Sequence, residues 1–259
     1  MVICMKLYVF SSGILKSTKD KFALGAPAEA FDIPVPYYFV DISEMGVKAL
    51  IDTGNSPGVI KDPKGTWGDI ANVYYPVMTE EQKPVNALKE IGVKPEDINY
   101  IFITHLHLDH AGSIKYFPKA KVIVQLAELR YAYFPDPMMK GAYIEADIKD
   151  PSIKWEPIEG IRSFFGGRIF VFPTPGHTPG HQSILVRLKN NPVIITGDAV
   201  YLRENLEKDI PSGFAASFSE AAHSYQVIKH LAEDEKAKVW FGHDPDEWKK
   251  IKLAPSYYD

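Results

Sequence analysis

The run from His105 to His110 constrains this chain more than any other part of its sequence. It reads His-Leu-His-Leu-Asp-His, which places three imidazoles and one carboxylate within six residues. Without a cation these groups would compete for protons and pack poorly. In an extended segment, His105, His107 and Asp109 project to one side and the two leucines to the other. The spacing predicts that His105 and His107 bind one cation. Asp109 and His110 would bind a second cation close by.

Three further ligand-type residues follow runs of apolar residues that we predict to be strands: His177, Asp198 and His243. Because the ends of neighbouring strands in an α/β protein converge on one edge of the sheet, these side chains can meet there. We expect His177 to complete the first site, His243 to complete the second, and Asp198 to bridge them. Imidazole and carboxylate ligands without a thiolate suit zinc or another borderline divalent ion.

Other polar residues have different expected roles. His223 and His230 lie on the polar side of a predicted helix and are typical surface histidines. For His181 we expect a supporting position rather than a metal bond. Asp52 lies in an Asp-Thr-Gly sequence, but the chain has one such sequence and not the pair that an aspartic protease needs. Asp52 is therefore predicted to accept a hydrogen bond from a metal-bound histidine.

Hydrophobic patterning predicts an α/β protein. Strands are expected over 6–10, 35–41, 47–52, 100–103, 121–124, 169–172, 183–186, 193–196 and 239–241. Amphipathic helices are expected over 79–91 and 219–234, and the first of them could instead begin at Pro84. Most later strands are apolar on both faces, so helices should cover the sheets. Residues 135–151 form the most irregular stretch and are interpreted as an insertion loop.

Composition excludes several classes of protein. The chain has 259 residues, 46% hydrophobic and 24% charged, which suits one globular domain over residues 1–259 and not a fibre, coiled coil or disordered tail. A net charge of −4 argues against nucleic-acid binding through a basic surface. No apolar run approaches the roughly 18 residues of a membrane span. With one cysteine, Cys4, and no evident leader, we expect a soluble cytoplasmic protein.

The ligand residues, in this order along the chain, resemble the metallo-β-lactamase superfamily. That resemblance implies a four-layer αββα sandwich with a dinuclear metal site at one edge. Shorter motifs resemble the N-acyl homoserine lactonases, which quench quorum signals: Lys64-Gly-Thr-Trp67, Gly141-Ala-Tyr-Ile144, Gly176-His-Thr-Pro-Gly-His-Gln182, Asp198-Ala-Val-Tyr201 and Phe241-Gly-His-Asp244.

The resemblance implies a hydrolase that opens the homoserine lactone ring through a hydroxide bridging two divalent ions. Zinc is the expected metal, with iron, cobalt or manganese as alternatives. Tyr201 would stabilise the oxyanion, and Asp109 would pass a proton to the leaving alkoxide. Dimerisation follows only by analogy with relatives, and no membrane partner is expected. The predicted pocket for the acyl chain consists of apolar and aromatic residues near the metals: Leu108, Trp67, Met138, Tyr143 and Ile144.

Several alternative functions remain compatible with the motif. The same site could open another small lactone such as γ-butyrolactone or pyridoxolactone, or hydrolyse a thiolester as glyoxalase II does. A nuclease is disfavoured by the acidic balance of the chain. A flavodiiron-type redox enzyme is disfavoured because that branch typically has Glu where this chain has His107. A binding module without activity is disfavoured because every expected ligand is present.

Overall fold

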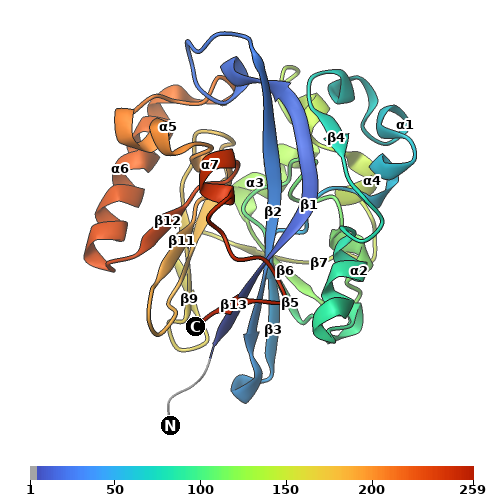
Figure 1. Cartoon of the computed structure of the whole chain (residues 1–259), viewed down its shortest axis with the longest axis vertical. Helices are drawn as coiled ribbons and strands as arrows, with labels where there is room; N and C mark the ends of the chain where they lie inside the picture. Colours follow the sequence, from blue (N-terminus) through green and yellow to red (C-terminus); the bar gives the residue numbers. More distant parts are fainter. Residues whose placement is uncertain (1–4) are drawn as a thin grey trace.

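The computed structural model describes residues 5–259 and consists of two mixed β-sheets packed against each other, with helices on the outer faces (Figure 1). The larger sheet has the order β13-β1-β2-β3-β5-β6-β7, and β4 pairs with β1. Its strands are β1 (Lys6–Thr18), β2 (Ala30–Ile42), β3 (Val47–Ile51), β4 (Tyr75–Val77), β5 (Tyr100–Phe102), β6 (Lys121–Gln125), β7 (Lys154–Ile158) and β13 (Tyr257–Tyr258).

The smaller sheet has the order β12-β11-β10-β9-β8. Its strands are β8 (Arg162–Phe164), β9 (Ile169–Pro173), β10 (Gln182–Val186), β11 (Val193–Ile195) and β12 (Lys238–Trp240). The helices are α1 (Pro63–Trp67), α2 (Pro84–Ala87), α3 (Leu126–Tyr133), α4 (Glu145–Ile148), α5 (Arg203–Lys208), α6 (Phe218–Asp234) and α7 (Pro245–Trp248). In Figure 1, α5 and α6 flank the smaller sheet, whereas α1, α2 and α4 lie on the far side of the larger one.

Alternating side chains divide the core into layers. Between the sheets, Leu7 and Val9 of β1 pack in one cluster with Val171 and Ile184 of the smaller sheet. The outer face of the larger sheet contributes Phe39, Leu50 and Ile101 to a second cluster, which includes Leu88 and Ala132. The outer face of the smaller sheet packs Leu185 and Ile194 against Tyr225 and Ile228 of α6. Successive residues of a strand face opposite sides, so each sheet is covered on both faces. The predicted αββα sandwich is confirmed.

The helix predicted over residues 79–91 does not start at Thr79, and the alternative start at Pro84 is confirmed. Helix α2 begins only at Pro84, and a 3₁₀ turn, Leu88–Ile91, follows it. Pro84 has no N–H and disfavours a helical conformation at Lys83, which is extended at φ −56° and ψ 129°. The segment does end at Gly92 as expected, because Gly92 adopts the left-handed conformation with φ 73°.

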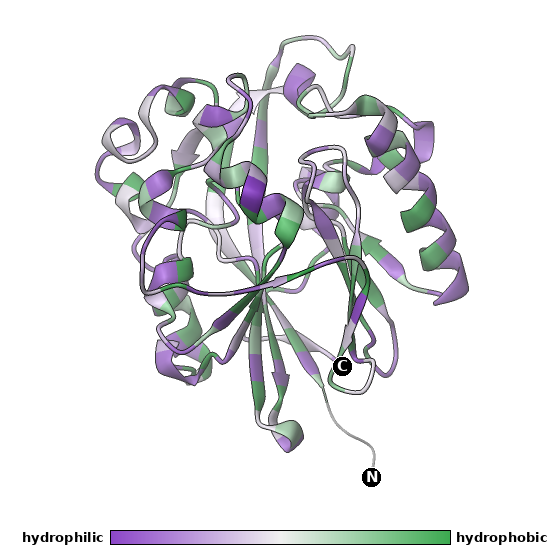
Figure 2. Cartoon of the chain, turned by 180° about the vertical axis from the view of Figure 1, so that it is seen from behind, coloured by the Kyte–Doolittle hydropathy of each residue, from purple (hydrophilic) through white to green (hydrophobic). Residues whose placement is uncertain are grey.

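The helix predicted over residues 219–234 is confirmed as α6, which starts one residue earlier. The Ser217 hydroxyl caps it by accepting a hydrogen bond from the Glu220 N–H. Both apolar and polar residues colour its ribbon in Figure 2, as expected for a helix with one face on a sheet. Among residues 5–259, no helix combines the length and the apolar character that crossing a membrane requires.

Other boundaries differ from the sequence prediction. Strands β1 and β2 are much longer than predicted, because β1 continues past a bulge between Ser11 and Ile14, where Gly13 has φ 91°. The 135–151 segment contains a 3₁₀ turn, Lys140–Ala142, and helix α4 rather than a plain loop. Cys4 lies outside the described residues.

Candidate metal centre

The 105–110 segment follows β5 and is held in place mainly by its backbone. The Leu106 N–H donates to Glu128 Oε1 at 2.9 Å, and the Leu108 N–H donates to the Ala142 carbonyl at 3.0 Å. The His110 N–H closes a turn onto the carbonyl of His107 at 3.1 Å. All six residues are buried. Their side chains therefore have a fixed direction before any ligand binds.

The first group of possible metal ligands contains His105, His107, His177 and Asp198. His177 comes from the loop between β9 and β10, and its Nε2 lies 3.1 Å from His105 Nε2 and 2.8 Å from His107 Nδ1. Asp198 follows β11, and its Oδ2 lies 3.4 Å from His177 Nε2. Three ring nitrogens and one carboxylate oxygen thus converge on one point.

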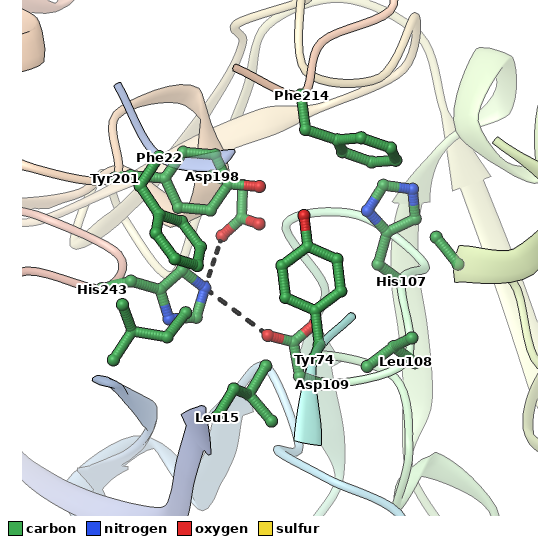
Figure 3. Close-up of a pocket in the computed structure, with 12 residues that line it drawn as sticks. Leu15, Phe22, Tyr74, His107, Leu108, Asp109, Asp198, Tyr201, Phe214 and His243 are labelled. Atoms are coloured by element: carbon green, nitrogen blue, oxygen red, sulfur yellow. Dashed lines mark ion pairs between the residues drawn. The ribbon is translucent and has the colours of Figure 1, made fainter. Parts of the chain in front are cut away.

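The second group contains Asp109, His110 and His243. The other carboxylate oxygen of Asp198, Oδ1, reaches this group: it lies 3.0 Å from His110 Nε2 and 2.9 Å from His243 Nε2. Asp109 Oδ2 lies 3.5 Å from His243 Nε2. Figure 3 draws His243 between the two carboxylates. Asp198 therefore faces both groups, as a bridging ligand would.

An outer layer of oxygens orients four of the histidines. His110 Nδ1 lies 2.8 Å from Asp52 Oδ2, and His243 Nδ1 donates to the Pro34 carbonyl at 2.7 Å. His177 Nδ1 donates to the Phe214 carbonyl at 3.2 Å. The Thr104 hydroxyl donates to Asp52 and lies 3.1 Å from His105 Nδ1. Each bond places the ring hydrogen on Nδ1 and leaves the Nε2 lone pair facing inward, which is how metal-binding histidines are held.

Burial and charge suit this centre to cations. Burial lowers the pKa of His105 and His107, and it lowers that of His177 to about 4. These imidazoles are therefore neutral and free to bind metal. Buried polar atoms without a hydrogen bond include Nε2 of His110 and of His243, and Oδ1 of Asp198. Burial alone would lower the pKa of His110 and of His243, but the charge of Asp198 outweighs it and raises both. A divalent ion bound there would take the place of the proton that these rings share with Asp198.

His181 belongs to neither group of possible metal ligands. Its Nε2 accepts hydrogen bonds from the backbone N–H groups of Asp198 at 3.1 Å and Ala199 at 3.2 Å. Its Nδ1–H therefore donates to the Thr174 hydroxyl, 2.9 Å away. The ring fixes the backbone that carries Asp198, which agrees with the supporting position expected from the sequence. His223 and His230 lie on α6 and belong to neither ligand group.

Tyr201 lies against the ligand set. Its hydroxyl is 3.3 Å from His177 Nδ1, and its ring stacks on that of His243 with centroids 5.4 Å apart. Burial, followed by the charge of Asp198, raises the pKa of this phenol. Tyr201 therefore keeps its proton and can donate a hydrogen bond beside the metal centre.

A partly open pocket lies over these groups (Figure 3). Apart from possible metal ligands and Tyr201, its lining residues are Leu15, Phe22, Ile33, Tyr74, Leu108, Ala142 and Phe214. The floor is thus polar and the walls are mainly apolar. This combination suits a small molecule with one reactive polar group and an apolar tail.

The predicted pocket residues do not all line this cavity. Leu108 does, as expected from its place inside the motif. Met138 does not fit the prediction, because its position in the 135–151 segment leaves it 84% exposed. Trp67 is buried in the hydrophobic cluster that contains Leu108 and Tyr201, and Ile144 packs against that cluster. The ring of Tyr143 packs against that of His107 with centroids 4.6 Å apart, and its hydroxyl donates a hydrogen bond to Glu128 Oε1. These three lie behind the lining.

Sequence reasoning missed the other lining residues and one buried acid. Leu15, Phe22 and Ile33 belong to or lie near the first two strands, far from any ligand in sequence. Tyr74 and Phe214 follow no motif and look like ordinary aromatic residues. Glu128 also gave no signal, although its carboxylate is fully buried and accepts hydrogen bonds next to the centre. All of these meet the site only through tertiary packing.

Comparisons with known proteins agree with this geometry. The Metallo-beta-lactamase superfamily model matches residues 31–243. The N-acyl homoserine lactonase AttM of Rhizobium radiobacter is 40% identical over 261 residues, which cover 98% of each chain. The N-acyl homoserine lactonase AiiA of Bacillus thuringiensis subsp. kurstaki is 32% identical, over 97% of this chain and 98% of its own.

Solved structures are similar as well. An N-acyl homoserine lactone hydrolase with N-hexanoyl-L-homoserine bound at its catalytic metal centre superposes with a TM-score of 0.89 and 30% identity. The superposition covers 99% of this chain and 100% of that one. A variant of AiiA with N-decanoyl-L-homoserine in its active site gives the same TM-score, identity and coverage. The fold, the paired ligand groups and these relatives together confirm the resemblance seen in the motifs: the chain belongs to the metallo-beta-lactamase superfamily.

Proposed function

We propose that this protein is a metal-dependent hydrolase that opens the lactone ring of N-acyl homoserine lactones. The observation that carries this proposal is the pair of ligand groups joined by Asp198 at the floor of an apolar pocket. Relatives at 40% and 32% identity over nearly the whole chain are named N-acyl homoserine lactonases. One solved relative holds a ring-opened acyl homoserine at its metal centre.

The proposed ligands fall into two sets that share one residue. His105, His107 and His177 would hold the first cation, and Asp109, His110 and His243 the second, with Asp198 between them. When bound, two divalent ions supply an activated water as nucleophile and polarise the lactone carbonyl. We propose zinc, because the donors are imidazole nitrogens and carboxylate oxygens.

Two side chains would then act on the substrate. The Tyr201 hydroxyl remains protonated and lies on the pocket wall, so it can donate to the carbonyl oxygen as negative charge develops there. Asp109 also lines the pocket, so its carboxylate can receive a proton from the attacking water. Returning this proton to the alkoxide would complete ring opening, and the product is a hydroxy acid.

A lactone panel with a pH indicator tests the proposal, because ring opening releases one proton per turnover at neutral pH. We expect turnover of N-acyl homoserine lactones, loss of that turnover after chelation, and recovery when zinc is added. The panel should include γ-butyrolactone and a thiolester. Faster hydrolysis of the thiolester than of any lactone would replace the proposed activity with that of a glyoxalase II-like enzyme.

A further inference from the structure

Tyr74 places a second phenol at the pocket. The residue follows the 3₁₀ segment Gly68–Asn72, and its ring packs against Phe22 at 6.1 Å and Phe214 at 6.5 Å between centroids. In contrast to Tyr201 and Tyr143, its hydroxyl makes no hydrogen bond to any residue between 5 and 259. The two aromatic neighbours therefore hold the ring of Tyr74 in place. Its hydroxyl remains able to donate a hydrogen bond to a bound molecule.

The Tyr74 hydroxyl is directed into the space that Asp198 and His107 also face (Figure 3). Burial, and then the charges of Asp109 and Asp198, raise the pKa of this phenol, so it remains a donor. Half-buried phenols usually find an acceptor. Leaving out the possible metal ligands and Tyr201, Tyr74 is the one lining residue with a polar side chain. An acceptor on the molecule that fills the pocket would therefore meet this hydroxyl.

We propose that the Tyr74 hydroxyl donates a hydrogen bond to the amide carbonyl of the acyl group, making Tyr74 a specificity-determining residue. This inference rests on the proposed function. In an N-acyl homoserine lactone, the lactone carbonyl and ring oxygen face the metal centre and Tyr201. The amide carbonyl is the remaining strong acceptor, and it lies where the ring joins the apolar chain. Tyr74 lies in the corresponding part of the pocket, between the polar floor and the apolar wall formed by Phe22 and Phe214.

The test compares two substrates and two variants. The substrates are N-hexanoyl homoserine lactone and an α-alkyl-γ-butyrolactone of matched length, which carries its chain at the same ring carbon without the amide. The variants are Tyr74→Phe and the control Tyr75→Phe, because Tyr75 is the next residue and is 51% exposed. Within residues 5–259 the hydroxyl of Tyr74 makes no hydrogen bond, so Tyr74→Phe should fold normally, as a thermal melt would check.

We expect Tyr74→Phe to raise KM for N-hexanoyl homoserine lactone about 3- to 10-fold, the usual effect of one lost hydrogen bond, with kcat unchanged. Both parameters for the alkyl lactone should stay at the wild-type values. Calorimetry with the zinc-loaded protein should show a matching loss of affinity for the ring-opened product, N-hexanoyl homoserine. Tyr75→Phe should match the wild type in every measurement.

Other results would overturn the inference. An equal loss on both lactones, or a fall in kcat, would mean that Tyr74 acts on the lactone itself. No loss on either substrate and no change in product affinity would mean that its hydroxyl makes no contact with the acyl group. If the wild-type protein opens neither lactone, the proposed function fails and the inference fails with it. That outcome is distinct, because it is visible before any variant is made.

Discussion

At the scale of single residues, the centre depends on side chains whose protons are fixed by their surroundings. Tyr201 is held between His177 and His243 and keeps its proton. Replacing Tyr201 by Phe should lower kcat for lactone opening about 10- to 100-fold, since one oxyanion donor is lost while the cations remain. Kinetics combined with metal analysis checks this. Tyr225→Phe is the matched control, a buried phenol on α6 that packs in the core. Unchanged kcat in Tyr201→Phe would remove Tyr201 from the reaction.

Asp109 combines two proposed roles that one substitution can separate. Its Oδ2 lies 3.5 Å from His243 Nε2 and 3.7 Å from His110 Nε2, within the second ligand group. Asp109→Asn keeps the shape but removes the charge, so we expect the zinc content to fall from two ions per chain toward one, with activity lost. Asp246→Asn, on the surface of α7, should change neither value. Two retained ions with a slow reaction would instead assign Asp109 to proton transfer alone.

At the scale of elements, Glu128 joins three segments that shape the centre. From α3, its Oε1 accepts from the Leu106 N–H at 2.9 Å and from the Tyr143 hydroxyl at 3.2 Å, and its Oε2 accepts from Thr178 Oγ1 at 2.6 Å. Leu106 lies between two predicted ligands, and Thr178 follows a third. Both carboxylate oxygens accept hydrogen bonds, whereas an amide of the same shape offers one acceptor oxygen and an NH2 donor in place of the other.

We therefore expect Glu128→Ala to destabilise the fold by about 3 kcal/mol, because a buried N–H loses its acceptor and a cavity remains. That corresponds to a fall in Tm of about 5–10 °C for a chain of this size. Glu128→Gln should lose less stability than the alanine variant, because it fills the same space and keeps one acceptor oxygen, and both zinc ions should remain. Thermal melts and metal analysis of the two variants provide the measurement. An alanine variant as stable as the wild type would contradict the joining role.

Individual elements also show which parts of the fold and of the candidate site can be predicted from the sequence. The 105–110 segment was predictable because its ligands are neighbours in the chain, and His177, Asp198 and His243 followed because strand ends converge. Of the two starts predicted for the helix that ends at residue 91, the one at Thr79 is wrong, because Pro84 disfavours a helical conformation in the residue before it. Tyr74 and Phe214 could not be found this way, since each comes from an irregular segment with no pattern. Only the packing of distant loops brings them to the pocket.

At the scale of the whole molecule, the candidate metal centre lies where loops from the two sheets meet. His105 and His110 follow β5 of the larger sheet, whereas His177, Asp198 and His243 come from loops that follow β9, β11 and β12 of the smaller one. Cations bound between them would link the two halves of the sandwich. Without cations, buried lone pairs and the Asp198 carboxylate are left to face each other.

Removing the metal should therefore reduce stability as well as activity. Ligand present at a thousandfold over its dissociation constant stabilises a folded protein by about 4 kcal/mol. For a chain of this length we expect chelation to lower Tm by about 10 °C or more. Scanning calorimetry before chelation, after it, and after zinc is restored gives the measurement. Addition of magnesium is the control, since it prefers an all-oxygen octahedral site and should restore little. An unchanged Tm after complete removal of both ions would mean that the sheets hold together without the centre.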